Sequence, residues 1–286
     1  MRHTSAACAV LATLLGVLSS NIARADFGAG LAAFRAGDYG AALSEFQPLA
    51  GQGEPQAQFY LGLSYQKGWG VIADPSKSAQ WYRRAADQGL TKAQHNLALL
   101  YLRGEGVAAD AKQARAWFER AAQQGDMRAA HELGLMYFRG TGVVRDFVQA
   151  HSWWQKAADA GEASAAYDLG ILYRRGQGGV LRDVAASIKL WLRAAHSGLA
   201  VAQNALGACY MHGDGVDADM LEAWAWFRLA AQGGLAVASV NADMVRAQLD
   251  DAQFEAAHRR FDTLGRELAA QASTAPRISD PFDQGP

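Results

Sequence analysis

Ser64 and Lys67 are the two residues whose types and spacing come closest to a catalytic pair. They spell S-x-x-K, the spacing at which a lysine lies beside a serine nucleophile in acyl-transfer enzymes. The companion motifs S-D-N and K-T-G, which complete that chemistry, do not occur in the chain. Neither Ser187 nor any other hydroxyl has an arrangement of His and Asp that the sequence can define. The sequence therefore predicts no catalytic residue.

Two histidines are the next candidates, because His95 and His131 lie 36 residues apart and could share a metal ion. A zinc site needs three or four protein ligands, and the sequence supplies no further ligand at matching positions. The G-x-G sequences resemble phosphate-binding loops only in spelling, since none follows a predicted strand. We expect neither a metal nor a cofactor.

The segment LGLMYFRGTGV, residues 133–143, recurs along the chain with few changes. LALLYLRGEGV lies 36 residues upstream, and LGLSYQKGWGV lies a further 36 residues upstream. LGILYRRGQGGV and LGACYMHGDGV follow downstream. A segment that recurs at a fixed step is typical of repeat architecture. Most of its residues are therefore expected to serve packing rather than activity.

Each unit has the pattern of two helices joined by a glycine loop, as residues 93–128 show. The first half places apolar residues at helical spacing, at Ala93, Leu97, Leu100 and Tyr101. These residues form one stripe on a first helix, which we call helix A. Gly104 follows helix A, and a left-handed glycine is a common helix terminator. Asp110 then offers an acceptor to the free N–H groups of a second helix, helix B.

The other units repeat this pattern position by position, and we call each set of equivalent positions a column. The alanines near the start of helix A are Ala57, Ala93, Ala129, Ala165 and Ala202. The predicted caps of helix B are Asp74, Asp110, Asp146, Asp183 and Asp219. The aromatic column of helix B is Tyr82, Phe118, Trp154, Trp191 and Phe227. The glycines that close the units are Gly89, Gly125, Gly161, Gly198 and Gly234.

These columns resemble the Sel-one-like repeat, a relative of the tetratricopeptide repeat with a period of about 36 residues. The resemblance covers five units, at residues 57–92, 93–128, 129–164, 165–201 and 202–237. It implies an all-α fold, a right-handed α-solenoid of antiparallel helix pairs with the A helices on its concave side. Members of this family are mostly adaptors in multiprotein complexes. Cysteine-rich members have been associated with β-lactam hydrolysis, but they carry a disulfide in each repeat, which this chain lacks.

The flanking segments are predicted to cap the solenoid, because stacked repeats need ends with one apolar and one polar face. Residues 26–56 have the pattern of a shorter helix pair that turns at Gly37-Asp38. Residues 238–271 are predicted to form the C-terminal capping helices, the second of which begins near Asp250 or Asp251. Residues 272–286 have three prolines and no periodicity, so we expect a disordered tail.

The N-terminal segment, residues 1–25, has the pattern of a secretory signal peptide. Arg2 and His3 precede an apolar run, and an A-x-A sequence predicts cleavage between Ala25 and Asp26. We therefore expect a periplasmic or secreted protein that does not insert into the membrane after cleavage. Cleavage removes two arginines and no acid, which changes the formal net charge from −1 to −3. That charge gives no indication of nucleic-acid binding, and we expect a monomer.

Specificity must come from positions that the repeat leaves free, and two columns of helix A are predicted to face the concave groove. The first column is Phe59, His95, His131, Tyr167 and Asn204. The second, four residues on, is Leu63, Leu99, Leu135, Ile171 and Ala208. Phe138 is a further variable position. Such a groove could hold an extended peptide or a partner helix; the alternative is that both columns pack neighbouring A helices together.

A cationic column ends helix A, and it too has two interpretations. Its members are Lys67, Arg103, Arg139, Arg175 and His212. These side chains could attract an acidic partner, or they could stabilise the negative end of the helix dipole. We predict an adaptor that binds another protein in the groove and serves a cell-envelope complex. The alternative is a β-lactamase-like hydrolase or a cell-wall glycan-binding protein in which Trp and Tyr stack on sugars.

Overall fold

The computed structural model describes residues 25–274, with side chains described as far as residue 270. The predicted signal peptide lies outside these residues except for Ala25, as does the predicted tail beyond residue 274. The described residues form helices and no strands. They divide into two compact units at Ala109–Asp110, which we call the N-terminal unit and the C-terminal unit.

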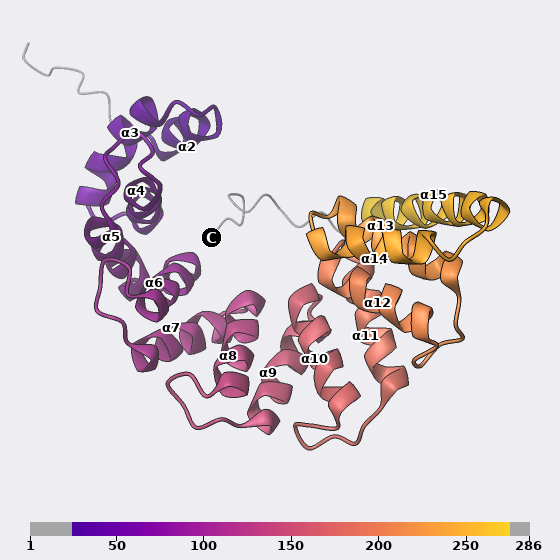
Figure 1. The fold of residues 1–286 in the computed structure, drawn as a ribbon. Coiled ribbons are helices and arrows are strands. Elements are labelled where there is room, and N and C mark those ends of the chain that lie inside the picture. Colours follow the sequence, from indigo (N-terminus) through magenta and orange to yellow (C-terminus); the bar gives the residue numbers. More distant parts are fainter. Residues whose placement is uncertain (1–24, 275–286) are drawn as a thin grey trace, which may run out of the picture. The chain divides into compact units, whose positions relative to one another are not determined.

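The N-terminal unit contains five described helices (Figure 1). They are α2 (Phe27–Arg35), α3 (Tyr39–Gly51), α4 (Pro55–Lys67), α5 (Pro75–Asp87) and α6 (Thr91–Arg103). Each helix packs against the next one in the chain. The carboxylates of Asp26 and Asp38 cap α2 and α3 by accepting from backbone N–H groups, so this capping pair turns at the predicted position.

The C-terminal unit continues the same alternation (Figure 1). Its helices are α7 (Ala111–Gln123), α8 (Met127–Arg139), α9 (Phe147–Asp159), α10 (Ala163–Arg175), α11 (Val184–His196), α12 (Ala200–His212), α13 (Met220–Gln232), α14 (Ala236–Arg246) and α15 (Asp251–Thr274). The A helices are α8, α10 and α12, and the B helices are α7, α9, α11 and α13. Consecutive helices pack together from α7 to α14, which confirms the predicted all-α fold of stacked helix pairs.

Both predicted helix signals are confirmed in the described repeats. Every A helix ends at a glycine in the left-handed conformation, such as Gly104 at φ 69°. Every B helix begins after an aspartate whose carboxylate accepts from backbone N–H groups of the first turn, as Asp110 does from Lys112 and Gln113. The alternation of helices thus follows from local signals that each repeat carries.

In most A helices a glycine follows a core leucine, as in Leu61-Gly62. This glycine is needed because an aromatic ring of helix B occupies the space beside it. A Cβ atom on Gly207 would lie 2.7 Å from the Phe227 ring, and one on Gly62 would lie 2.8 Å from the Tyr82 ring. These rings are fully buried, and large aromatic side chains contribute much of the free energy of such cores. The repeated glycine is therefore a packing residue.

The A helices begin two residues before the alanine column, so the predicted unit boundaries are shifted slightly. The helices start at Pro55, Thr91, Met127, Ala163 and Ala200. Carboxylates at the preceding position cap three of them, namely Glu54, Asp126 and Glu162. The alanines are buried core residues of the first turn rather than first residues of the helix.

The C-terminal end is closed by α15, which packs against α13. Trp224, Val245 and Ala257 are buried in one apolar cluster, against which Phe254 and Phe261 pack. Arg260 pairs with Glu222 on α13. The helix continues to Thr274, three residues beyond the predicted end, so the first three residues of the predicted disordered tail are helical.

The position of Trp69 in the first glycine loop predicts an exposed tryptophan, and the structure contradicts this prediction. It stacks on Tyr39 with ring centroids 5.0 Å apart and 3° between the planes, and it meets the edge of Phe34 at 5.5 Å. The side chain is half-buried. The sequence could not show this contact, because it joins the first glycine loop to the preceding helix pair.

Candidate functional site

The variable positions of helices A gather on one side of the C-terminal unit, which we call the A-helix face. Its residues are His131, Leu135 and Phe138 of α8, Tyr167 and Ile171 of α10, and Asn204 and Ala208 of α12. All seven are half-buried, and α8 and α10 contact each other directly. In the N-terminal unit, the equivalent Phe59 and His95 are buried, while Leu63 and Leu99 are half-buried.

The first predicted column joins neighbouring A helices through side-chain hydrogen bonds. His131 Nε2 donates to Asp168 Oδ2 at 2.8 Å, linking α8 to α10. Asn241 Nδ2 donates to Asn204 Oδ1 at 2.9 Å, linking α14 to α12. The groups of this column therefore take part in packing between repeats, which was the alternative to a binding role.

The backbone of this column is also engaged, because the large aromatic residues of helix B bond to it. Trp154 Nε1 donates to the carbonyl of His131 at 3.1 Å, and Trp191 Nε1 donates to that of Tyr167 at 3.0 Å. Burial, followed by the negative charge of Asp168, raises the pKa of the Tyr167 hydroxyl above its ordinary value. The nearby Arg175 charge opposes this shift.

Two residues of the second column and Phe138 line a hollow between α8 and α10 with a volume of about 150 Å³. Leu135, Phe138 and Ile171 line it together with Trp154. Phe138 packs on the Trp154 ring with centroids 5.3 Å apart. The charged side chains at the hollow are Arg139, Asp168 and Arg175. This combination of apolar and charged groups makes the hollow the strongest candidate for recognition on the face.

Asp168 was missed by the sequence reasoning, although it binds a predicted site residue and lines the hollow. A signal was available: Asp168 follows His131 by 37 residues, one more than the repeat period, and Asn241 follows Asn204 by the same interval. The face also continues onto α14, where Val240 and Met244 are 58% and 48% exposed.

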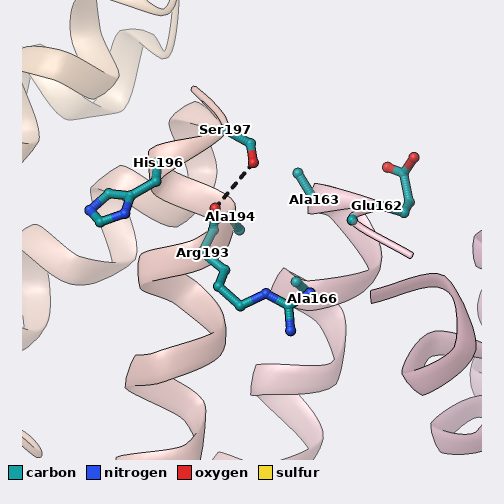
Figure 2. A pocket seen from close by; sticks show the side chains of 8 residues that line it. Glu162, Ala163, Ala166, Arg193, Ala194, His196 and Ser197 are labelled. Carbon is teal, nitrogen blue, oxygen red and sulfur yellow. Dashed lines mark hydrogen bonds between the residues drawn. The ribbon is translucent and has the colours of Figure 1, made fainter. Parts of the chain in front are cut away.

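A second hollow, of about 280 Å³, lies where the turn before α10 meets the end of α11 (Figure 2). Arg193 extends across it toward Ala166, and His196 points away from it (Figure 2). Ala166 occupies a column in which three other repeats have a buried glutamine, at Gln58, Gln94 and Gln203. The missing side chain accounts for the space, so a structural origin suffices for this hollow.

Those glutamines donate hydrogen bonds to the last turn of the preceding helix B, and in the two other repeats a cation of helix B does so instead. The amides of Gln58, Gln94 and Gln203 donate to the carbonyls of Ala50, Ala86 and Ala195 at 3.2, 3.3 and 3.1 Å. Where alanine replaces glutamine, Lys156 donates to the carbonyl of Ala122 at 3.4 Å and Arg193 donates to that of Ala158. We call these five residues the donor column, although they come from two sets of equivalent positions, one on helix A and one on helix B.

Ser64 and Lys67, the residues considered for catalysis, differ in their exposure. Ser64 is 1% exposed inside α4, whereas Lys67 is exposed at the end of that helix. Within residues 25–274, no cluster of three His, Cys, Asp or Glu side chains could hold a metal ion. Cys209 is buried, and burial raises the pKa of its thiol.

The described helices define a helical repeat protein built from stacked helix pairs. Five segments match the Sel1 repeat family, at residues 55–90, 91–126, 128–162, 163–199 and 200–235. The chain belongs to the Sel1 repeat family. Proteins of this family generally mediate protein–protein interactions and act as non-catalytic scaffolds.

Two solved structures are similar to this chain over most of its length. A Sel1 repeat protein from Oxalobacter formigenes is 32% identical, with a TM-score of 0.69, over 73% of this chain and 83% of its own. The second is c5321, a protective antigen from uropathogenic Escherichia coli with an SLR fold. It is also 32% identical, with a TM-score of 0.69. The match covers 83% of this chain but 53% of c5321.

The comparison with curated proteins found no match to the chain. Among the helices of residues 25–274, none is both long and apolar enough to span a membrane.

Proposed function

We propose that this protein is an exported adaptor that binds another protein on its A-helix face and thereby assembles or regulates a cell-envelope complex. The observation that carries the proposal is the hollow between α8 and α10, where Leu135, Phe138 and Ile171 meet charged side chains. Interaction sites combine apolar anchors with polar groups at their rim. We also propose that the protein binds its partner as a monomer.

The export of the protein is supported by the position of the first described helix. Asp26, the residue after the predicted cleavage site, caps α2 through its side chain. Its backbone N–H donates to Glu45 Oε2 at 2.7 Å. Cleavage before Asp26 would leave both contacts in place and would put a positively charged amino group beside the Glu45 carboxylate. N-terminal sequencing of the mature protein should therefore begin at Asp26.

The hydrolase and glycan-binding alternatives have less support. Ser64 is buried, so the S-x-x-K spelling does not present a nucleophile to a substrate. All eight tryptophans lie in the described part of the chain, and none is exposed. Two of the half-buried ones, Trp81 and Trp153, lie beneath Arg84 and Lys156. Sugar stacking would need exposed aromatic faces.

Site-specific crosslinking tests the binding face. A photoreactive amino acid at position 135 or 171 in cells should trap a defined protein, because both positions line the hollow. Position 189 is the matched control, since Lys189 is exposed on the B helix α11. Capture of a protein from position 189, with nothing or only glycan from positions 135 and 171, would place binding on another surface and refute the proposal.

A further inference from the structure

The size of the hollow between α8 and α10 indicates what it can accept. Its volume of about 150 Å³ is below the ~300–1,000 Å³ that is usual for small-molecule and cofactor sites. Its wall is aliphatic and aromatic, with Leu135, Phe138 and Ile171 from two helices. A space of this kind suits one bulky apolar side chain of a larger molecule.

Two guanidinium groups border this space, and both are available to bind a partner. Arg139 and Arg175 are the last residues of α8 and α10, and both are exposed. Within the described part of the chain, neither side chain forms an ion pair or a hydrogen bond. The equivalent Arg103 instead forms an ion pair, with its Nη1 atom 3.8 Å from Glu105 Oε1. The acid at the hollow, Asp168, is already bonded to His131.

These last-turn carbonyls do not need the arginines as hydrogen-bond donors. The carbonyl of Met136 accepts from the N–H groups of Gly140 and Thr141, both at 2.9 Å. The carbonyl of Leu172 likewise accepts from Gln177 at 3.0 Å. Backbone groups thus satisfy these last-turn carbonyls without the side chains. Each guanidinium keeps five N–H donors, which match the geometry of carboxylates.

We propose that the A-helix face of the C-terminal unit recognises an acidic, extended peptide segment of its partner. A Leu, Ile or Phe side chain of the peptide fills the hollow, and Asp or Glu side chains close to it in sequence bind Arg139 and Arg175. The charges at the hollow favour an acidic occupant. Among the described residues Arg139 and Arg175 are unpaired, whereas the acid at the hollow, Asp168, is already bonded to His131. This inference rests on the proposed function and adds the chemistry of the partner.

Selection from a random dodecapeptide display library on the purified full-length protein tests the inference. The enriched peptides should carry Asp or Glu close in sequence to Leu, Ile or Phe, because both arginines border the hollow. One enriched peptide, labelled with a fluorophore, is then titrated against the wild-type protein and two double variants. These are Arg139→Gln/Arg175→Gln and the matched control Lys67→Gln/Arg103→Gln, which changes equivalent helix ends in the N-terminal unit.

The first double variant should weaken binding about tenfold or more, as expected for the loss of charge-assisted hydrogen bonds. The control should change it less than about twofold, because exposed charges away from the contact contribute little. Circular dichroism establishes that both variants are folded; if the first is not, Arg139→Lys/Arg175→Lys, which keeps the charge but loses the paired donors, takes its place. Enrichment of neutral or basic peptides, equal effects of the two double variants, or no enrichment overturns the inference.

The proposed function fails in a different way. Neutral or basic peptides that crosslink to position 135 or 171 leave the binding face intact and refute only the acidic chemistry. Peptides that bind but never crosslink from these positions refute the face itself.

Discussion

The buried amide of Gln94 shows how one polar side chain completes the end of a neighbouring helix. The carbonyl of Ala86 already accepts from the N–H of Gly89 at 2.9 Å, so Gln94 serves its second lone pair. The side chain is 3% exposed and also fills the space that stands open beside Ala166 (Figure 2). Its contribution is therefore both a hydrogen bond and packing.

We predict that Gln94→Ala lowers the free energy of unfolding by about 1–2 kcal/mol, from the lost hydrogen bond and the space left behind. Urea denaturation followed by circular dichroism measures the change. Gln123→Ala, at an exposed position of α7, is the control and should be close to neutral. Equal effects of the two substitutions would contradict the role of the donor column.

Tyr82 gives a prediction about alkaline pH. Burial raises the pKa of its hydroxyl well above the ordinary value, and the hydroxyl lies 2.9 Å from Gln66 Oε1. In the unfolded chain this tyrosine ionises near pH 10, whereas the folded chain keeps it neutral. Its contribution to stability is thus complete below about pH 10 and is lost as pH rises toward the folded pKa.

Tyr82→Phe should therefore be less stable than the wild type at pH 7.5, by about 1 kcal/mol for the lost hydrogen bond. The difference should shrink as the pH rises from 10 to 11.5, because only the wild type loses stability through this group. Urea denaturation at both pH values measures it. Parallel losses of stability in the two proteins would show that Tyr82 does not titrate on unfolding.

At the scale of the elements, helix B depends on its aspartate cap. Asp146 accepts from the N–H groups of Val148 and Gln149 at 2.8 and 3.1 Å. Asp146→Ala should lower the free energy of unfolding by about 0.5–2 kcal/mol, measured by urea denaturation. Asp146→Asn keeps an acceptor oxygen and should recover most of the loss. An asparagine variant as unstable as the alanine variant would mean that capping is not the cause.

A glycine that closes a unit and a glycine of the loop between helices A and B together give a test that separates backbone strain from collision. Gly89 and Gly106 have φ values of 91° and 71°, which disfavour other residues. A Cβ atom on Gly89 would meet nothing within 4 Å, whereas one on Gly106 would collide with the carbonyl of Pro75. The second glycine of G-x-G is therefore fixed by contact as well as by conformation.

We predict that Gly89→Ala costs about 1–2 kcal/mol of stability from its left-handed backbone alone. Gly106→Ala should cost about 1–3 kcal/mol more, because overpacking adds to the strain. Thermal unfolding of both variants measures the difference. If the two variants unfold at the same temperature, the loop does not need close contact with the start of α5.

The helices were predictable because their signals are local. The aspartate caps, the terminal glycines and the apolar stripes each lie within one repeat, and all of them function as expected in the described repeats. The face was less predictable, since its chemistry depends on contacts between repeats. The sequence shows His131 and Tyr167 at equivalent positions. It does not show that His131 bonds to Asp168, or that Arg139 and Arg175 reach one hollow.

At the scale of the whole molecule, the C-terminal end must be closed to keep the solenoid soluble. Removing residues 251–286 would uncover Trp224 and Val245, which α15 helps to bury, and exposed apolar patches promote association. We predict oligomers or aggregates, detected by size-exclusion chromatography with light scattering. Removal of residues 275–286 alone is the control and should elute as the full-length protein does. Identical elution of both truncations would contradict a capping role for α15.

The donor column bears on how such a chain can change in length. Each donor belongs to the repeat that follows the carbonyl it satisfies, whether it is a glutamine of helix A or a cation of helix B. A duplicated or deleted 36-residue cassette would thus bring or remove its own donor and leave no helix end incomplete. The hydrogen bond between His131 and Asp168 does not have this property, because both of its partners are side chains particular to their own repeats. The donors bond instead to backbone carbonyls, which every repeat supplies. Recombination between repeats would therefore preserve the scaffold while rearranging the surface that selects a partner.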